Sequence, residues 1–268
     1  ILGGLSLIPL IFLVKMTTPD NRPKKLKHLQ HWYLFKAGAF CGLALFTAMS
    51  LQQYSMISAS AGKAGFISAL YIIFVPLISM FFGAKLENKI KVSVGLALVG
   101  LYLLCFKGGL TGFDMYDGLL LIGAFFYGVH ILVVNHFSRH VNPVKMSCVQ
   151  FFVVGLLSLP FMLMFENPVA ANFVAAKTPI LYAGILTCGV AYTLQIFGQK
   201  FTSPTIASII LCMESVFAVV GGSLILHETM TPREVWGCIF MIIAVVLSQI
   251  QMKNFKKGLT VCSQNNEE

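Results

Sequence analysis

Residues 48–85 read AMSLQQYSMISASAGKAGFISALYIIFVPLISMFFGAK, and residues 191–228 read AYTLQIFGQKFTSPTIASIILCMESVFAVVGGSLILHE. The two stretches align without a gap at a fixed offset of 143 residues and share 7 identities in 38 positions. Each copy consists of an apolar segment, a short polar break and a second apolar segment. An internal repeat in a hydrophobic chain is typical of a membrane protein made of two structural repeats.

The composition supports a membrane protein. The chain is 57% hydrophobic and 11% charged, with a mean hydropathy of +0.82, whereas soluble domains carry about 25% charged residues. A net charge of +9 would suit nucleic-acid binding in a soluble protein, but here the basic residues lie between apolar segments. Membrane topology therefore accounts for them, and we expect a lipid bilayer but no nucleic acid as partner. The 7 cysteines are scattered and form no CxxC motif, so neither a metal site nor a disulfide framework is expected.

The apolar segments predict transmembrane helices. They lie at 1–14, 31–54, 60–83, 90–106, 116–137, 145–165, 178–199, 203–226 and 232–252. Crossing the hydrocarbon layer takes about 20 helical residues, and every segment except the first is long enough, allowing some slack at 90–106. The first lacks the basic flank of a signal peptide, and we expect it to be the end of a longer helix.

The repeat also predicts how many helices the parent protein has. Residues 1–10 resemble the middle of 145–165, because Gly3, Leu5, Ser6 and Leu7 match Gly155, Leu157, Ser158 and Leu159. The second copy has a further helix at 116–137, so we expect a ten-helix parent whose first helix is missing from this chain. Five helices per repeat is an odd number, so the second copy must enter the membrane from the opposite side, as in an inverted repeat.

The expected fold class is thus an all-α integral membrane protein, an inverted repeat of two five-helix units. We expect the first repeat at 1–108, the second at 109–253 and a disordered tail at 254–268. The loop at 17–30 is charged and rich in proline, which predicts exposure to water.

The basic residues predict the orientation. Of the 19 Lys and Arg residues, 15 fall in the segment joints on one side of the predicted membrane and 4 on the other. Because positive loops stay inside, the 15–36 loop and the C-terminus are expected in the cytoplasm, with the chain in the plasma membrane.

Helix breakers lie inside two matching segments. Segment 60–83 contains Pro76 and three glycines, and segment 203–226 contains Pro204 and two glycines. In lipid, a carbonyl that loses its backbone partner needs a protein neighbour, so breaks favour helices that border a cavity. The alternative is that the glycines only allow close helix packing.

Motifs in both copies resemble those of a known family. Leu-Gln-Gln at 51–53, AGKAGF at 61–66 and FVPL at 74–77 resemble the first repeat of EamA-type members of the drug/metabolite transporter superfamily. FTSP at 201–204, ESVF at 214–217 and His-Glu at 227–228 resemble the second. The resemblance implies a ten-helix inverted-repeat carrier that exports amino acids or other small metabolites. A nucleotide-sugar or other solute carrier of the same superfamily is the alternative.

Glu214 is the clearest ionisable residue far from the ends of its segment. A carboxylate at that depth costs several kcal/mol unless it is paired, protonated or in contact with water. It aligns with Tyr71 at the repeat offset, so both copies place a polar group at this depth. We expect Glu214 to couple transport to protons or substrate. Alternatively, it only bonds two helices together.

Uncharged polar groups complete the predicted pathway. Gln52 and Gln195 are partners in the repeat, Tyr192 shares a helical face with Gln195, and His130 lies within 116–137. We expect the pathway to run between 31–54, 60–83, 116–137, 178–199 and 203–226, faced by Gln52, Tyr71, His130, Tyr192, Gln195 and Glu214. Lys63 either extends to the membrane surface or attracts an anionic substrate group at a helix start.

Other function classes fit less well. His-Glu at 227–228 lacks the second histidine of a zinc protease motif, and neither Gly-x-Ser-x-Gly nor a Walker lysine motif occurs, which argues against an enzyme. A channel would use a filter loop or charged rings, which the sequence does not suggest. No cofactor or metal is expected. A small-molecule metabolite and protons are the expected partners, and a homodimer is a further expectation.

Overall fold

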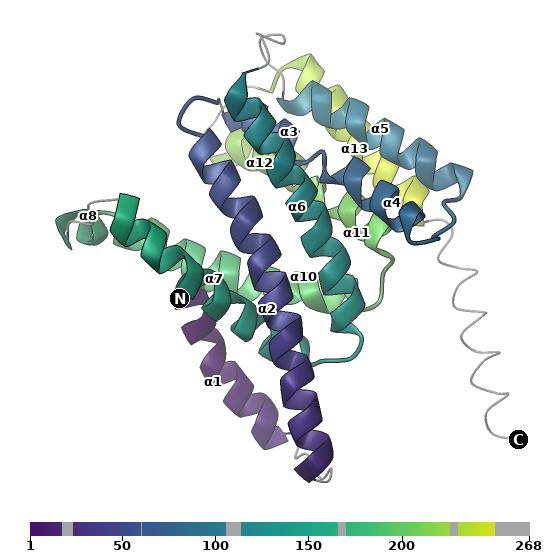
Figure 1. Cartoon of the computed structure of the whole chain (residues 1–268). Helices are drawn as coiled ribbons and strands as arrows, with labels where there is room; N and C mark the ends of the chain where they lie inside the picture. The colour runs from purple at the N-terminus through teal and green to yellow at the C-terminus, as the bar shows by residue number, and fades with distance from the viewer. Residues whose placement is uncertain (18–23, 60, 106–113, 166–169, 226–229, 250–268) are drawn as a thin grey trace, which may run out of the picture. The chain divides into compact units, whose positions relative to one another are not determined.

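The computed structural model describes residues 1–17, 24–59, 61–105, 114–165, 170–225 and 230–249, and within these ranges every regular element is a helix (Figure 1). Eight helical stretches are long and apolar enough to cross a membrane. They are Gln30–Ser55, Lys63–Phe81, Asn88–Cys105, Met115–Ser138, Pro143–Phe165, Lys177–Gln199, Pro204–Ile225 and Pro232–Gln249. They match the predicted segments to within three residues at the ends the structure describes, which confirms the all-α membrane fold class.

The helices follow one another in the order α1 (Leu2–Thr17), α2 (Lys24–Ser55), α3 (Ala61–Ser68), α4 (Tyr71–Phe81), α5 (Asn88–Cys105), α6 (Met115–Ser138), α7 (Pro143–Phe165), α8 (Ala170–Ala175), α9 (Lys177–Leu181), the π-helix η1 (Tyr182–Ala191), α10 (Tyr192–Gln199), α11 (Pro204–Leu211), α12 (Met213–Ile225) and α13 (Pro232–Gln249). Helix α2 already begins at Lys24, inside the predicted loop at 17–30, and residues 18–23 of that loop lie outside the described residues. The tail at 254–268 and the His-Glu motif at 227–228 lie outside the described residues.

Short polar motifs fix where three long helices begin. Before α6, the Asp114 and Asp117 carboxylates each accept a hydrogen bond from the other's backbone N–H at 2.9 Å. Thr231 and Glu234 form the equivalent reciprocal pair before α13. At α7 the Asn142 side chain accepts from two backbone N–H groups. These caps satisfy backbone donors that the first helical turn leaves without partners.

Two membrane-spanning stretches are broken, and the breaks correspond in the repeat. The first lies at Ala69–Leu70, between α3 and α4, and the second at Cys212, between α11 and α12. At each break a backbone bond spans three residues rather than four: Ile72 N–H donates to Ala69 O at 3.1 Å, and Ser215 N–H donates to Cys212 O at 3.2 Å. Such bonds tighten the helix locally.

The prolines are not at these breaks, contrary to the prediction from their sequence positions. Pro76 lies inside α4, and Pro204 is the first residue of α11. A proline at the first helical position costs no hydrogen bond, because the N–H it lacks would have no helical partner there. Pro204 therefore starts a helix and does not interrupt one.

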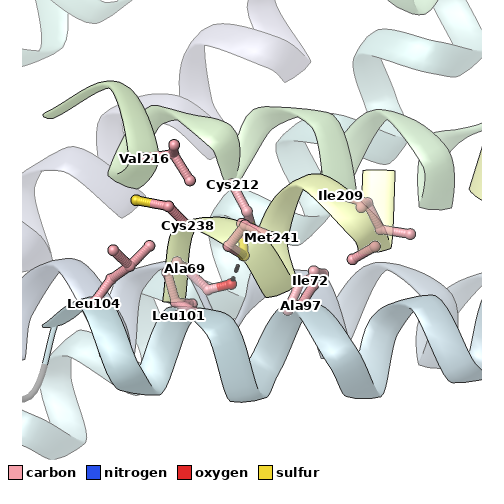
Figure 2. Packing of buried hydrophobic residues seen from close by; sticks show 11 residues of the cluster. Ala69, Ile72, Ala97, Leu101, Leu104, Ile209, Cys212, Val216, Cys238 and Met241 are labelled. Carbon is pink, nitrogen blue, oxygen red and sulfur yellow. Dashed lines mark hydrogen bonds between the residues drawn. The ribbon is translucent and has the colours of Figure 1, made fainter. Parts of the chain in front are cut away.

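The chain forms two compact units. Unit 1 consists of residues 1–54 and 122–204, and unit 2 consists of residues 55–121 and 205–268. Each unit draws helices from both predicted repeats. In unit 1, an apolar cluster is made by Ala37, Cys41, Val134, Val141, Met146 and Ile196. In unit 2, the main cluster is made by Ala69, Ile72, Ala97, Leu101, Leu104, Ile209, Cys212, Val216, Cys238, Met241 and Ala244 (Figure 2).

In unit 2, α5 packs on α13 through small residues. A Cβ atom built on Gly100 would lie 2.9 Å from the Gly237 carbonyl oxygen, and one built on Gly237 would lie 2.9 Å from the Gly100 carbonyl oxygen. Leu104 also contacts Gly237, whereas Gly100 reaches Met241, so the two helices run in opposite directions. The missing side chains let the two backbones approach closely, which is the common device of helix packing in membranes.

In unit 1, α1 packs on η1 and α7 in the same way. A Cβ atom on Gly3 would lie 2.5 Å from the Cβ of Cys188, and one on Gly155 would lie 2.6 Å from the Ile1 side chain. The Cys148 thiol donates to the Gly4 carbonyl oxygen at 3.4 Å. Helix α1 is thus held against two helices of the second predicted repeat.

Large apolar side chains remain on the outside of both units. Leu156 is 72% exposed in unit 1, and Phe217 and Leu224 are 69% and 71% exposed in unit 2. Extended apolar surface of this kind is unfavourable in water and favourable in a bilayer.

Candidate functional site

A buried polar cluster lies in unit 1 between α6, α7 and α10. His130 is 1% exposed, and its Nε2 atom lies 3.0 Å from Oε1 of Gln150, which is fully buried. The His130 ring meets the Tyr192 ring edge-on at 6.3 Å between centroids, and Tyr192 meets Phe151 at 5.4 Å. The structure thus brings two predicted pathway residues, His130 and Tyr192, together around an amide that the sequence did not single out.

Further hydrogen bonds tie the same three helices together. The Thr193 and Ser147 hydroxyl oxygens lie within hydrogen-bond distance, 2.9 Å apart, one turn along α7 from Gln150. Closer to the end of α6, Asn135 Nδ2 donates to the backbone carbonyls of Gln199 at 2.9 Å and Thr202 at 2.7 Å. Polar contacts therefore extend along α6, α7 and α10 from the middle of the helices to their ends.

Gln52 is bonded within unit 1 as well. The Tyr127 hydroxyl on α6 donates to Gln52 Oε1 on α2 at 2.5 Å, and Gln52 is half-buried. A hydrogen bond between membrane helices contributes about 0.6 kcal/mol on average. Gln52 thus links α2 to α6 through its side chain.

The polar residues on the predicted face of α10 become more buried toward the C-terminal end of the helix. Tyr192 and Gln195 are half-buried, and Gln199, one turn beyond Gln195, is 3% exposed. Neither amide atom of Gln199 has a hydrogen-bond partner, and Gln150 Nε2 also lacks one. A buried amide without a partner costs about 1–3 kcal/mol, so these atoms are expected to meet water or a solute.

The sequence held a signal for the residues that were missed. Gln150 is the only amide in α7, which is otherwise apolar apart from a lysine and two serines. An amide in an apolar membrane helix needs a hydrogen-bond partner inside the protein, and His130 is that partner for Gln150. Ser147, Thr193 and Asn135 gave no such signal, because small polar side chains also bond to their own helix backbone, as Thr193 does to Gly189 O.

The predicted site residues of unit 2 have different environments. Glu214 stands in the first turn of α12, directly after the break at Cys212, and its side chain is exposed. The Glu214 carboxylate is therefore not buried by the rest of the chain, whereas its central position in an apolar segment suggested that it would be. Tyr71, its repeat partner, is half-buried and packs against the apolar cluster that contains Cys212.

Lys63 is engaged in an ion pair, which neither of its two predicted roles included. Its Nζ atom lies 2.6 Å from Asp117 Oδ2, and the two side chains are 16% and 0% exposed. The same carboxylate oxygen accepts the Asp114 N–H that caps α6. The pair links the start of α3 to the start of α6 inside unit 2.

Within the ranges that the structure describes, no three His, Cys, Asp or Glu side chains are grouped so that they could hold a metal ion. The buried polar cluster of unit 1 consists instead of amides, hydroxyls and the His130 imidazole, which are groups that form hydrogen bonds.

Comparison with known proteins identifies the family of this chain. The model of the EamA-like transporter family matches residues 1–106 and 115–249. An uncharacterized transporter of Archaeoglobus fulgidus is 32% identical over 228 residues, which cover 85% of this chain and 72% of that protein. An uncharacterized transporter of Clostridium kluyveri is 24% identical over 253 residues, 90% of this chain and 80% of that protein.

A crystal structure of another protein, 16% identical in sequence, superposes with a TM-score of 0.71 and covers 95% of this chain and 85% of its own. At that identity the likeness shows a shared fold alone. The family match extends over nearly the whole chain, and the eight membrane-length helices agree with it. The chain belongs to the EamA-like transporter family.

Proposed function

We propose that this transporter is a secondary carrier that exports small organic metabolites, such as amino acids, by alternating access. The observation that carries the proposal is the buried polar cluster of His130, Gln150 and Tyr192, which lies about two turns inside the ends of membrane-length helices. Polar groups at membrane depth are expensive and mark solute pathways.

Alternating access needs two interconvertible packings, and an inverted repeat supplies them. Contacts between repeat partners support this arrangement. In unit 2, the antiparallel helices α5 and α13 occupy corresponding places in the two copies, as do the breaks at Ala69 and Cys212. In unit 1, α1 packs on α7, the helix that it resembles in sequence.

The proposed orientation in the membrane and the proposed coupling ion rest on the sequence predictions. We place the chain in the plasma membrane with its C-terminus in the cytoplasm, because 15 of 19 basic residues fall on one side of the predicted topology. Protons are the proposed coupling ion, with Glu214 as the proposed coupling residue. Fusing a reporter that fluoresces only in the cytoplasm to the C-terminus tests the orientation, and a dark fusion at normal expression would contradict it.

A flux assay tests the function. The purified protein is reconstituted into liposomes loaded with one amino acid, and the uptake of the labelled amino acid is measured against protein-free liposomes. Saturable exchange is expected, with uptake that rises when unlabelled substrate is inside. Steady ion conductance without saturable exchange would indicate a channel, and exchange of nucleotide sugars alone would assign the other carrier class of the superfamily.

A further inference from the structure

The buried amides of unit 1 have hydrogen-bonding capacity that the protein does not use. Gln150 is fully buried, and its Oε1 atom is engaged by His130 while its Nε2 atom has no partner. Turning the amide over would only exchange the two ends, since His130 contacts one of them. One polar end of Gln150 is therefore left for a group that the chain does not supply.

Gln199 repeats this situation nearer the ends of the helices. It is 3% exposed, and both its Nε2 and Oε1 atoms lack partners. Its backbone carbonyl is held by Asn135 on α6, five residues beyond His130, which is about 7.5 Å along the helix. Two buried amides with unused hydrogen-bonding capacity thus lie on α7 and α10, the two helices that bond to α6 in this cluster.

The electrostatics around these amides are neutral. Among the side chains that the structure describes, the buried carboxylates are Asp117 and Glu234; both lie in unit 2, and both cap their own helices. Lys145 and Lys200, the basic residues next to α7 and α10 in the sequence or within their first turn, are only half-buried and stand at the helix ends. A solute with a full net charge would find no buried counter-charge among the described side chains of unit 1, and leaving water would cost it several kcal/mol.

We propose that Gln150 and Gln199 are substrate contacts that select uncharged solutes, with Gln150 acting beside His130 and the Tyr192 ring. This inference rests on the proposed transport function and narrows its substrate class to uncharged metabolites. An uncharged solute pays less to leave water than an ion or a zwitterion, and its oxygen or nitrogen atoms can take the unused hydrogen bonds of the amides. Organic cations and anions are disfavoured, because the described side chains of unit 1 offer them no buried counter-charge.

The first measurement is binding, which does not depend on transport. The shift in unfolding temperature of the purified protein is recorded against six solutes: xylose and ribitol as neutral, lysine and tetraethylammonium as cationic, and glutamate and succinate as anionic. At least one neutral solute is expected to stabilise the protein at a concentration at least tenfold lower than any charged one. A charged solute that binds best, or the absence of any stabilisation, which would mean that water alone meets the amides, overturns the proposal.

Substitutions then locate the contact. Gln150→Leu is expected to weaken binding of the neutral solute about threefold to tenfold, as the loss of one hydrogen bond predicts. Gln150→Glu keeps the shape and adds a buried charge, so it is expected to weaken neutral binding and to improve binding of the cations. Gln53→Leu, an exposed amide on α2, is the matched control and should bind as the parent does.

Two further measurements distinguish a lost substrate contact from misfolding and from a failure of the proposed transport function. If Gln150→Leu does not give a single peak on size-exclusion chromatography, Gln150→Asn retains the amide but shortens its reach, and it is expected to weaken binding in the same direction. Flux of the six solutes is measured in parallel. Transport that prefers cations or anions would overturn the selectivity while leaving the proposed function intact, whereas neutral binding without flux would contradict the transport function alone.

Discussion

The Sγ atom of Cys212 lies 3.9 Å from the carbonyl oxygen of Ala69, and the two residues are 143 positions apart, which is the offset of the internal repeat (Figure 2). Each residue marks the break of a membrane-spanning stretch. The two breaks therefore contact each other inside unit 2, with Ile72 and Ile209 in the same apolar cluster. A residue that contacts its own repeat partner lies close to the axis that relates the copies, which agrees with the proposed symmetry.

This contact leaves little room for a larger side chain. Cys212 is 1% exposed, so Cys212→Leu is expected to overpack the cluster and destabilise the protein by about 1–3 kcal/mol. Cys212→Ser is the size-matched control; its hydroxyl can donate to the Ala69 carbonyl, and it should stay within about 1 kcal/mol of the parent. Thermal unfolding in detergent measures both. Equal midpoints for the leucine variant and the parent would contradict the tight packing of the breaks.

The contact between α5 and α13 makes a second prediction. Gly100→Ala places a Cβ atom 2.9 Å from the Gly237 carbonyl oxygen, so the helices must separate and the unfolding midpoint is expected to fall. Gly95→Ala on the same helix has nothing within 4 Å of its Cβ and is expected to be neutral or stabilising by up to about 1 kcal/mol.

The double variant Gly100→Ala with Gly237→Ala extends this test. The two added methyl groups enter the same contact, so the combined loss should differ from the sum of the single losses. Strict additivity, or a loss for Gly95→Ala as large as that for Gly100→Ala, would show that the α5–α13 contact does not limit stability.

The ion pair between Lys63 and Asp117 predicts strong coupling. Removing one partner of a buried pair leaves a charge without compensation, so Lys63→Met is expected to destabilise by about 3 kcal/mol, reduced to the extent that Lys63 is in contact with solvent. In the double variant Lys63→Met with Asp117→Asn, no charge is stranded, and the loss should be smaller than the sum of the single losses. Lys89→Met, which removes an exposed lysine, is the control. Additive losses would show that the two charges act independently.

The helices were predictable from sequence because length and apolar composition decide them in a bilayer. The segments 116–137 and 178–199 matched Met115–Ser138 and Lys177–Gln199. The internal form of the helices was not predictable. The second of these spans contains the π-helix Tyr182–Ala191, and α3 and α4 divide at Ala69 rather than at Pro76. These local changes depend on tertiary contacts, which hydropathy does not record.

The candidate site was only partly predictable for a similar reason. His130 and Tyr192 stood out because they are bulky polar residues in apolar helices, and the structure brings them together. Gln150 and the Lys63–Asp117 pair depend on which helices are neighbours. A repeat fixes which residues are equivalent to each other, but it does not state which side chains meet across helices.

Glu214 provides the test of proton coupling. Its side chain is exposed in the first turn of α12, where an acid favours the helix start by about 0.3–1 kcal/mol. In a bilayer, an exposed carboxylate meets either water in a pathway or lipid, and lipid contact costs several kcal/mol. If Glu214 meets the pathway and takes up protons, Glu214→Gln should flatten the dependence of flux on an imposed proton gradient while the free energy of unfolding changes by less than about 1 kcal/mol.

Glu87→Gln, an exposed acid between α4 and α5, is the control for this variant and should keep the gradient dependence of the parent. Glu214→Leu separates the two environments further. A pathway carboxylate replaced by leucine should lose coupled transport, whereas a carboxylate that faces lipid should gain stability on the same change, because the desolvation cost is removed. Coupled transport by Glu214→Gln that equals the parent at every pH, together with a raised unfolding midpoint for Glu214→Leu, would assign Glu214 to the lipid-facing surface. In that event, the proton-coupling role would pass to a different residue.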